Sequence, residues 1–109
     1  VDRTNEKVAD FYLPHHPAIL RALKKVVEAA SAHHKEVSIC GDMANDERYI
    51  FYFLGIGIRK ISLEVRYISK IQRIISLIDL KSAEKEVQSL LAKSRITEIA
   101  EIIERKTVF

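Results

Sequence analysis

Two short apolar, β-branched runs constrain this fold more than any other feature of the sequence. The first occupies residues 36–40 and is broken at once by Gly41, and the second occupies residues 60–63. Runs this short between segments of helical spacing are typical of buried strands in a parallel sheet. The order helix, strand, helix, strand, helix therefore predicts an α/β fold.

A helix is expected between the two strands. Asn45 or Asp46 can cap it, and it runs to about residue 54, where Gly55 and Gly57 are expected to end it. Four aromatic side chains crowd this segment and are expected in a core or at an apolar interface: Tyr49, Phe51, Tyr52 and Phe53.

Helical spacing also appears on both sides of this unit. A helix over residues 17–31 or 17–32 precedes the first strand, and Pro17 suits its first turn. A helix over residues 68–78 follows the second strand. Two further helices are expected near the end, capped by Ser82 and Ser94.

Two parallel strands alone leave unpaired edges, because such strands normally lie inside larger sheets. Either a second copy completes the sheet, or the rest of a longer polypeptide does. We favour the second, because the chain opens at Val1 without an initiator methionine. Its 109 residues, 48% of them hydrophobic, suffice for one modest core.

Composition excludes several classes of protein. A net charge of +3 is too weak to indicate nucleic-acid binding, and no apolar run approaches the roughly 18 residues that cross a bilayer. No signal peptide is recognisable at the start. A single cysteine excludes an internal disulfide framework and fits a reducing cytoplasm.

Three stretches carry a resemblance to a known family: VDRTNEKVADFYLPHHPAIL, VSICGDMANDE and FLGIGIRKISL. They resemble Enzyme I, the phosphoenolpyruvate–protein phosphotransferases of the bacterial sugar phosphotransferase system. The most specific landmarks are Asp-Arg-x-Asn near the start and Cys-Gly-acid-x-Ala-x-Asp-Glu after it. Pyruvate phosphate dikinase and phosphoenolpyruvate synthase share the Cys-Gly-acid core and match the flanking sequence less well.

The resemblance implies an incomplete TIM (β/α)8 barrel, made of its last two strands with their helices plus two C-terminal helices. Residues 1–109 would be the C-terminal portion of a phosphoenolpyruvate-binding barrel domain, whose magnesium ligands and phosphorylated histidine lie upstream. The implied partners are phosphoenolpyruvate, the carrier protein HPr and a second subunit of a homodimer, in the cytoplasm, with no nucleic acid and no membrane insertion. The isolated segment is expected to be inactive. The alternatives are a small α/β interaction module and a fragment of a related phosphoenolpyruvate-using enzyme, either pyruvate phosphate dikinase or phosphoenolpyruvate synthase.

Cys40 is the candidate catalytic residue. Phosphoenolpyruvate that has lost its phosphoryl group is an enolate, which needs a proton at carbon to become pyruvate. A thiol, with an ordinary pKa of about 8.5, can carry that proton. The family's proton donor falls on Cys40, at the strand end where barrels place their chemistry. Without the resemblance, a small buried hydrophobe is the ordinary interpretation of this residue.

Arg3 is the candidate substrate-binding residue. Its planar guanidinium suits phosphate or carboxylate oxygens, and the family's arginine at this position contacts substrate phosphate. Gly41 and Asp42 are candidates for a supporting role: Gly41 removes bulk beside the thiol, and Asp42 stands where the family has glutamate. Asn45 stands where the family has glycine.

Other features favour structural interpretations. Asp46 and Glu47 are expected to be first-turn helix acids rather than metal ligands. The pairs His15-His16 and His33-His34 lack the spacing of a helical metal pair and are expected in solvated loops. The basic stretch 59–73 is expected on a solvated helix face, although GIRKISLEVRYISK departs from the family, which has an acid before this strand and small residues after it.

Overall fold

The computed structural model describes residues 5–7, 16–92 and 96–105. In order, its elements are α1 (Pro17–Ala32), β1 (Ser38–Ile39), η2 (Asp42–Asn45), η3 (Glu47–Tyr49), α2 (Ile50–Ile56), β2 (Lys60–Ile61), η4 (Val65–Tyr67), α3 (Ile68–Leu77), α4 (Leu80–Leu91) and α5 (Ile96–Arg105). The predicted first helix, from about residue 17 to residue 31 or 32, is confirmed. None of the helices within the described ranges is long and apolar enough to cross a membrane.

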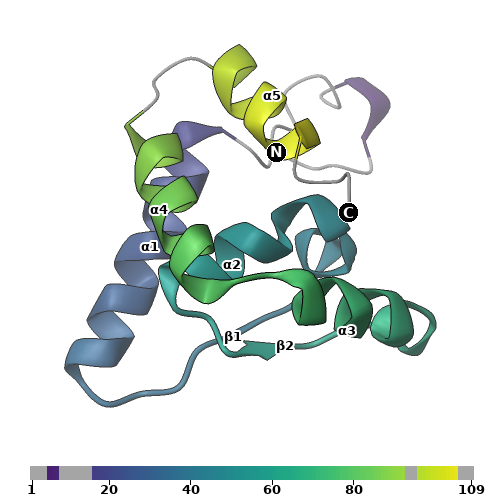
Figure 1. The fold of residues 1–109 in the computed structure, drawn as a ribbon, viewed down its shortest axis with the longest axis horizontal. Coiled ribbons are helices and arrows are strands. Elements are labelled where there is room, and N and C mark those ends of the chain that lie inside the picture. Colours follow the sequence, from purple (N-terminus) through teal and green to yellow (C-terminus); the bar gives the residue numbers. More distant parts are fainter. Residues whose placement is uncertain (1–4, 8–15, 93–95, 106–109) are drawn as a thin grey trace.

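β1 and β2 form a two-stranded parallel sheet, which confirms the predicted α/β class. Ser38 lies opposite Lys60, and Ile39 lies opposite Ile61. Each strand is shorter than predicted, and each has one partner strand among the described residues. Figure 1 shows α2, α3, α4 and α5 on one side of the strands, with α1 beside them.

The two faces of the sheet differ in character. The residues that face the helices are apolar and partly buried against the core: Val37, Ile39, Ile61 and Leu63. Their neighbours in the sequence are exposed: Ser38, Cys40, Lys60 and Ser62. Because successive side chains of a strand point to opposite faces, this second set lies on the face away from the helices.

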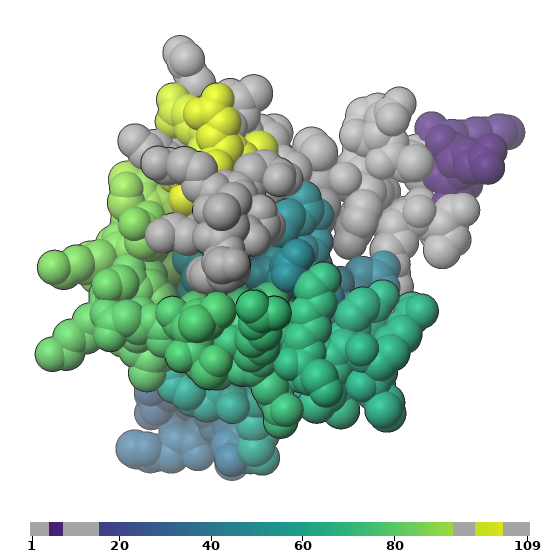
Figure 2. Space-filling view, turned by 45° about the vertical axis from the view of Figure 1, so that its right-hand side comes forward, coloured from purple at the N-terminus to yellow at the C-terminus, as the bar shows by residue number. Residues whose placement is uncertain are grey.

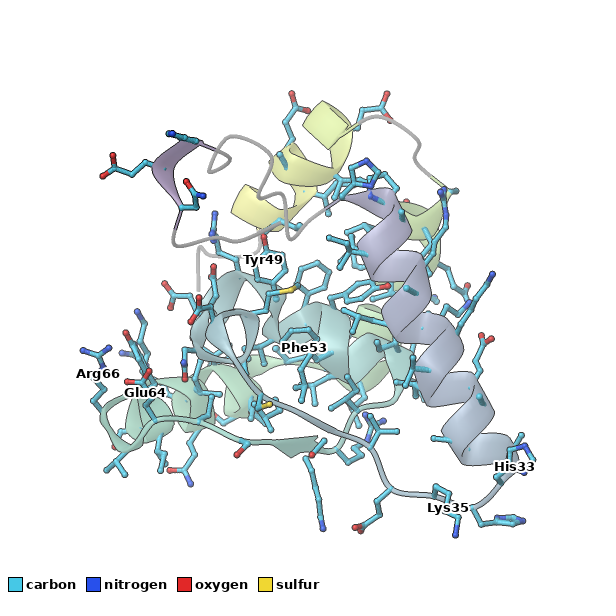
Figure 3. The ribbon with its side chains drawn as sticks, turned by 180° about the vertical axis from the view of Figure 1, so that it is seen from behind. His33, Lys35, Tyr49, Phe53, Glu64 and Arg66 are labelled. Atoms are coloured by element: carbon cyan, nitrogen blue, oxygen red, sulfur yellow. The ribbon has the colours of Figure 1, made fainter. Side chains whose placement is uncertain are left out.

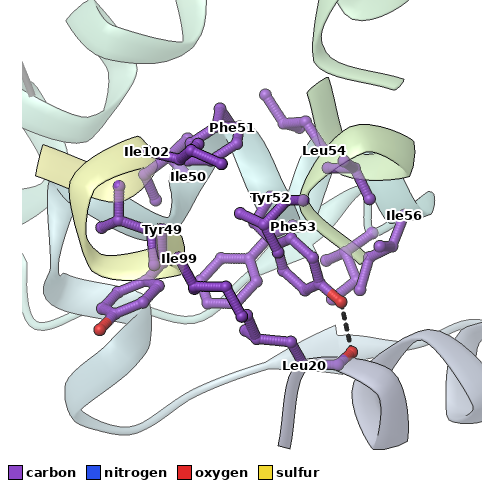
Figure 4. Packing of buried hydrophobic residues seen from close by; sticks show 14 of the residues in the cluster. Leu20, Tyr49, Ile50, Phe51, Tyr52, Phe53, Leu54, Ile56, Ile99 and Ile102 are labelled. Atoms are coloured by element: carbon purple, nitrogen blue, oxygen red, sulfur yellow. Dashed lines mark hydrogen bonds between the residues drawn. The ribbon is translucent and has the colours of Figure 1, made fainter. Parts of the chain in front are cut away.

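α2 is buried on all sides and forms the centre of the core. Its buried residues are Ile50, Phe51, Tyr52, Phe53, Leu54 and Ile56. The Tyr52 hydroxyl donates a hydrogen bond to the Leu20 carbonyl of α1 (Figure 4). Burial raises the pKa of Tyr52, against the smaller opposing effect of Arg21. The predicted aromatic core is therefore confirmed, with each large side chain contributing about 1.5–3 kcal/mol of burial free energy.

Gly55 does not end this helix as predicted, because it lies inside α2. A Cβ at this position would lie 2.5 Å from Cγ2 of Val87 and 2.8 Å from the backbone oxygen of Ala83. Gly55 therefore permits close packing of α2 against α4. Gly57 ends the helix, with a left-handed φ of 107°.

Two predicted caps also differ from the structure. Asp46 accepts from the Arg48 N–H and caps η3, so α2 itself begins only at Ile50. α4 begins at Leu80 and is capped by Asp79, to which both the backbone N–H and the hydroxyl of Ser82 donate. An acidic cap one turn earlier accepts both bonds, so the helix starts before Ser82. Ser94 lies outside the described residues.

Candidate functional site

Cys40 directly follows β1, at the carboxyl end of the strand. Its side chain is exposed, and the alternation along the strand places it on the open face of the sheet, away from the helices. The interpretation of Cys40 as a small buried hydrophobe is therefore wrong. The thiol is accessible to a small molecule that approaches this open face.

Gly41 adopts a backbone conformation that favours glycine, with φ of 88° and ψ of −169°. A Cβ added here would meet no described atom within 4 Å. The glycine is therefore required by the turn that follows the cysteine rather than by crowding within the described part of the chain. This turn leads into η2, which begins at the exposed Asp42.

Asn45, at the end of η2, joins the segments that follow the two strands. Its Nδ2 donates to the Gly41 carbonyl at 3.4 Å, and its Oδ1 accepts from the Glu64 backbone N–H at 3.3 Å. One side chain thus links the turn beside Cys40 to Glu64, three residues after β2. The predictions missed this role, although the asparagine in place of the family's glycine signalled a changed turn.

The segments that follow the two strands border a polar hollow of about 370 Å³, whose lining does not include Cys40. Its lining residues are Asp42, Asn45, Asp46, Glu47, Glu64, Arg66, Tyr67 and Lys70. Figure 3 shows Glu64 and Arg66 at one end of the molecule and His33 and Lys35 at the other. The hollow therefore lies at the edge of the sheet where α/β proteins bind ligands.

Most of the carboxylates around this hollow are already paired with cations. Glu64 accepts from Arg66 Nε at 3.0 Å, and Glu47 lies 3.5 Å from Lys70 Nζ. Asp46 accepts a bidentate interaction from Arg48, with a shortest distance of 2.7 Å. In the described part of the chain, no three His, Cys, Asp or Glu side chains form a group that could hold a metal ion. These residues therefore do not fit a magnesium site.

Arg66 and Lys70, from the basic stretch 59–73, line the hollow. The sequence predicted only that this stretch lies on a solvated helix face. Arg66 and Lys70 are nevertheless exposed, as predicted. The guanidinium of Arg66 lies over the Tyr67 ring, 4.8 Å from its centre. Asp46 and Glu47 are confirmed as acids at the start of a helical turn, η3.

Arg3 and the two histidine pairs, which the sequence also singled out, do not line the hollow or lie outside the described residues. Arg3 and His15 lie outside the described residues. His16 caps α1, since its Nδ1 accepts from the Ala18 N–H. His33 and His34 are exposed after α1, near the amino end of the strands, as expected of loop residues.

Comparisons with known proteins agree on one family. The family described as "PEP-utilising enzyme, PEP-binding domain" matches residues 1–80. The "Phosphoenolpyruvate-protein phosphotransferase" of Listeria monocytogenes is 34% identical over 106 residues, which are 97% of this chain and 18% of that protein. The protein of the same name in Bacillus subtilis is 36% identical over 102 residues, 94% of this chain and 18% of its own length.

A third relative is the "Phosphoenolpyruvate-dependent phosphotransferase system" protein of Escherichia coli. It is 34% identical over 99 residues, which are 91% of this chain and 13% of that protein. The chain therefore spans less than a fifth of the length of these relatives.

Proposed function

This chain belongs to the phosphoenolpyruvate-utilising enzymes, within their phosphoenolpyruvate-binding domain, and from that premise we propose that it is the closing segment of a phosphoenolpyruvate–protein phosphotransferase. The longer polypeptide would transfer the phosphoryl group of phosphoenolpyruvate to one of its own histidines and then to the carrier HPr. In this proposal the protein acts in the cytoplasm as a homodimer.

The proposed fold of the longer domain is a (β/α)8 barrel, to which this chain contributes the last two strands. The sheet supports this proposal, because its apolar face packs on the helices while its polar face is open. In a barrel, helices cover the outside of the strands and the inward side chains fill the interior. Ser38, Cys40, Lys60 and Ser62 would then face the interior.

The proposed role of Cys40 is proton donation. After phosphoryl transfer the substrate remains as an enolate, and the Cys40 S–H bond breaks as a new C–H bond forms at the terminal carbon. Pyruvate leaves, and the thiolate regains a proton from water. One observation carries this assignment: the thiol is exposed on the open face, at the carboxyl end of the strand.

Arg3 is proposed to bind the substrate phosphate, and Asp42 and Gly41 to shape the turn beside the thiol. Magnesium, which would screen the charge of the phosphate and carboxylate, is proposed to bind residues outside this chain. The paired acids around the hollow support this division, because Asp46 and Glu64 already accept hydrogen bonds from Arg48 and Arg66, and Glu47 forms an ion pair with Lys70.

The test is the Cys40→Ala substitution in the full-length polypeptide. We expect pyruvate formation to fall by about 10²–10⁴-fold in kcat, the range of general acid catalysis, with KM for phosphoenolpyruvate little changed. Ser38→Ala is the matched control, because Ser38 lies on the same open face, in β1, two residues before Cys40. Unimpaired turnover in the Cys40→Ala enzyme would refute the proton-donor role.

A further inference from the structure

The backbone on each side of Cys40 is tied by a hydrogen bond that comes from outside its own strand. Before the cysteine, the Ile39 carbonyl accepts from the Ser62 N–H at 2.8 Å. After it, the Gly41 carbonyl accepts from Nδ2 of Asn45 at 3.4 Å. The first bond continues the parallel pairing of β1 with β2, whereas the second comes from a side chain. The position of the thiol therefore depends on Asn45 as well as on strand pairing.

The Asn45 side chain is itself held in one orientation by the segment after β2. Its Oδ1 accepts from the Glu64 N–H at 3.3 Å, so Nδ2 is the atom that donates to the Gly41 carbonyl. Exchanging the two amide atoms would set donor against donor and acceptor against acceptor. Figure 2 shows the segments around η2 and around η4 next to each other on the face turned toward the viewer. The half-buried amide therefore bridges these two segments.

Gly41 needs support from outside the turn, because glycine restricts its own backbone less than any other residue. The Ala44 N–H also donates to the Gly41 carbonyl, at 3.1 Å, but this bond lies within the turn that begins η2. It shapes the turn without connecting it to β2. The Asn45 side chain supplies that connection, through Glu64. Without it, the turn that carries the residue next to the thiol loses one of its attachments to the neighbouring strand.

We propose that Asn45 is a positioning residue for proton transfer from Cys40, because it fixes the Gly41 carbonyl, and with it the thiol, relative to the segment after β2. This inference rests on the proposed role of Cys40 as proton donor. The S–H bond breaks as the C–H bond forms, and Asn45 neither gains nor loses a proton. A misplacement of about 1 Å can slow a reaction about 100-fold. Glycine, which the family has here, could form neither side-chain bond, so this support is a feature of this chain.

A single-turnover experiment on the full-length polypeptide tests this proposal. Radiolabelled phosphoenolpyruvate measures phosphoryl transfer to the protein, and lactate dehydrogenase measures the pyruvate that forms afterwards. In Asn45→Ala, phosphoryl transfer should proceed at close to the wild-type rate, while pyruvate formation should slow about 10–100-fold. KM for phosphoenolpyruvate should change little, because the lost bonds do not bind substrate. Equal slowing of both steps would indicate a general loss of structure and would overturn the proposal.

The matched control is Ser82→Ala, which also removes a side-chain hydrogen bond. The Ser82 hydroxyl donates to Asp79 at the start of α4 and is outside the lining of the hollow. This variant should leave the ratio of the two rates unchanged, and a change as large as that in Asn45→Ala would contradict the proposal. If Asn45→Ala fails to fold, Asn45→Asp replaces it, since aspartate keeps the acceptor for the Glu64 N–H and loses the donor to Gly41. Pyruvate formation at the wild-type rate in Asn45→Asp would refute the positioning role.

A double variant separates this proposal from the proton-donor role on which it rests. In a Cys40→Ala background, Asn45→Ala should slow pyruvate formation no further, because the group that it positions is gone. An equal effect of Asn45→Ala in both backgrounds would refute the positioning role and leave the proton-donor role intact. Unimpaired turnover in Cys40→Ala alone would refute the proton-donor role, and the positioning role with it.

Discussion

The backbone N–H of Glu64 donates a hydrogen bond to Oδ1 of Asn45 at 3.3 Å, so a side chain from the segment after β1 holds the segment after β2. The same side chain donates to the Gly41 carbonyl, next to Cys40. The segments that follow the two strands and border the polar hollow are coupled through this one residue. A substitution of Asn45 should therefore affect the structure of both segments that border the hollow.

Replacing Asn45 with alanine should destabilise the chain by about 1 kcal/mol, because both hydrogen bonds are lost. Asn45→Asp keeps an acceptor for the Glu64 N–H but loses the donor to the Gly41 carbonyl. Its change in the free energy of unfolding should therefore differ in size from that of Asn45→Ala. Urea denaturation of the wild type and the two variants measures the change in the free energy of unfolding. An Asn45→Ala variant as stable as the wild type would show that the linkage contributes nothing.

Gly55→Ala should destabilise the protein by about 1–3 kcal/mol, although alanine is the better helix former by about 1 kcal/mol. The new methyl group would overlap the Val87 side chain and the Ala83 backbone oxygen. The double variant Gly55→Ala, Val87→Ala should stay destabilised, because the overlap with the backbone oxygen remains. A Gly55→Ala variant more stable than the wild type in urea would contradict the observed packing.

The stability contributed by Asp79 should depend on pH. The side-chain and backbone hydrogen bonds from Ser82 hold the pKa of Asp79 below its usual range. A carboxyl with a depressed folded-state pKa stabilises the protein above its unfolded pKa of about 3.9, and this contribution is lost as the pH falls through the folded pKa.

The matched variant is Asp79→Asn, which keeps an acceptor for the helix cap but does not titrate. The difference in urea midpoint between the wild type and Asp79→Asn should shrink between about pH 6 and about pH 3. A difference that stays constant over this interval would argue against the assigned pKa shift.

The Cys40 thiol should react with iodoacetamide in the folded chain at a rate within about tenfold of that in urea, because its side chain is exposed. Mass spectrometry of the intact chain measures the rate, and no other cysteine competes. In the full-length polypeptide, phosphoenolpyruvate should slow the reaction. Strong protection of the thiol in the isolated, folded chain would contradict its position on the open face.

The isolated 109-residue chain should not transfer phosphate from phosphoenolpyruvate to HPr. We propose that the phosphorylated histidine and the magnesium ligands lie outside it, and no described group of side chains could hold a metal ion. Radiolabelled phosphoenolpyruvate measures the transfer, with the full-length polypeptide as the positive control. Labelling of HPr by the isolated chain would refute the proposed division of the site.

The sequence alone determined the order of elements, because that order depends on local properties. Apolar spacing and Pro17 placed α1 correctly, and β-branched runs placed both strands. The crowded aromatics indicated the buried segment that became α2. The landmark around Cys40 also identified the family. Each of these signals lies within a few residues of the element that it specifies.

Only the tertiary structure decided the features that depend on residues far apart in the chain. Gly55 resembles a helix end in the sequence, yet Val87 and Ala83 on α4 make it a packing position inside α2. Asn45 binds Glu64 because the parallel register brings the two strand ends together. The exposure of Cys40 likewise depends on contacts between distant segments, because the helices pack on the face that Val37 and Ile39 line and leave the opposite face open.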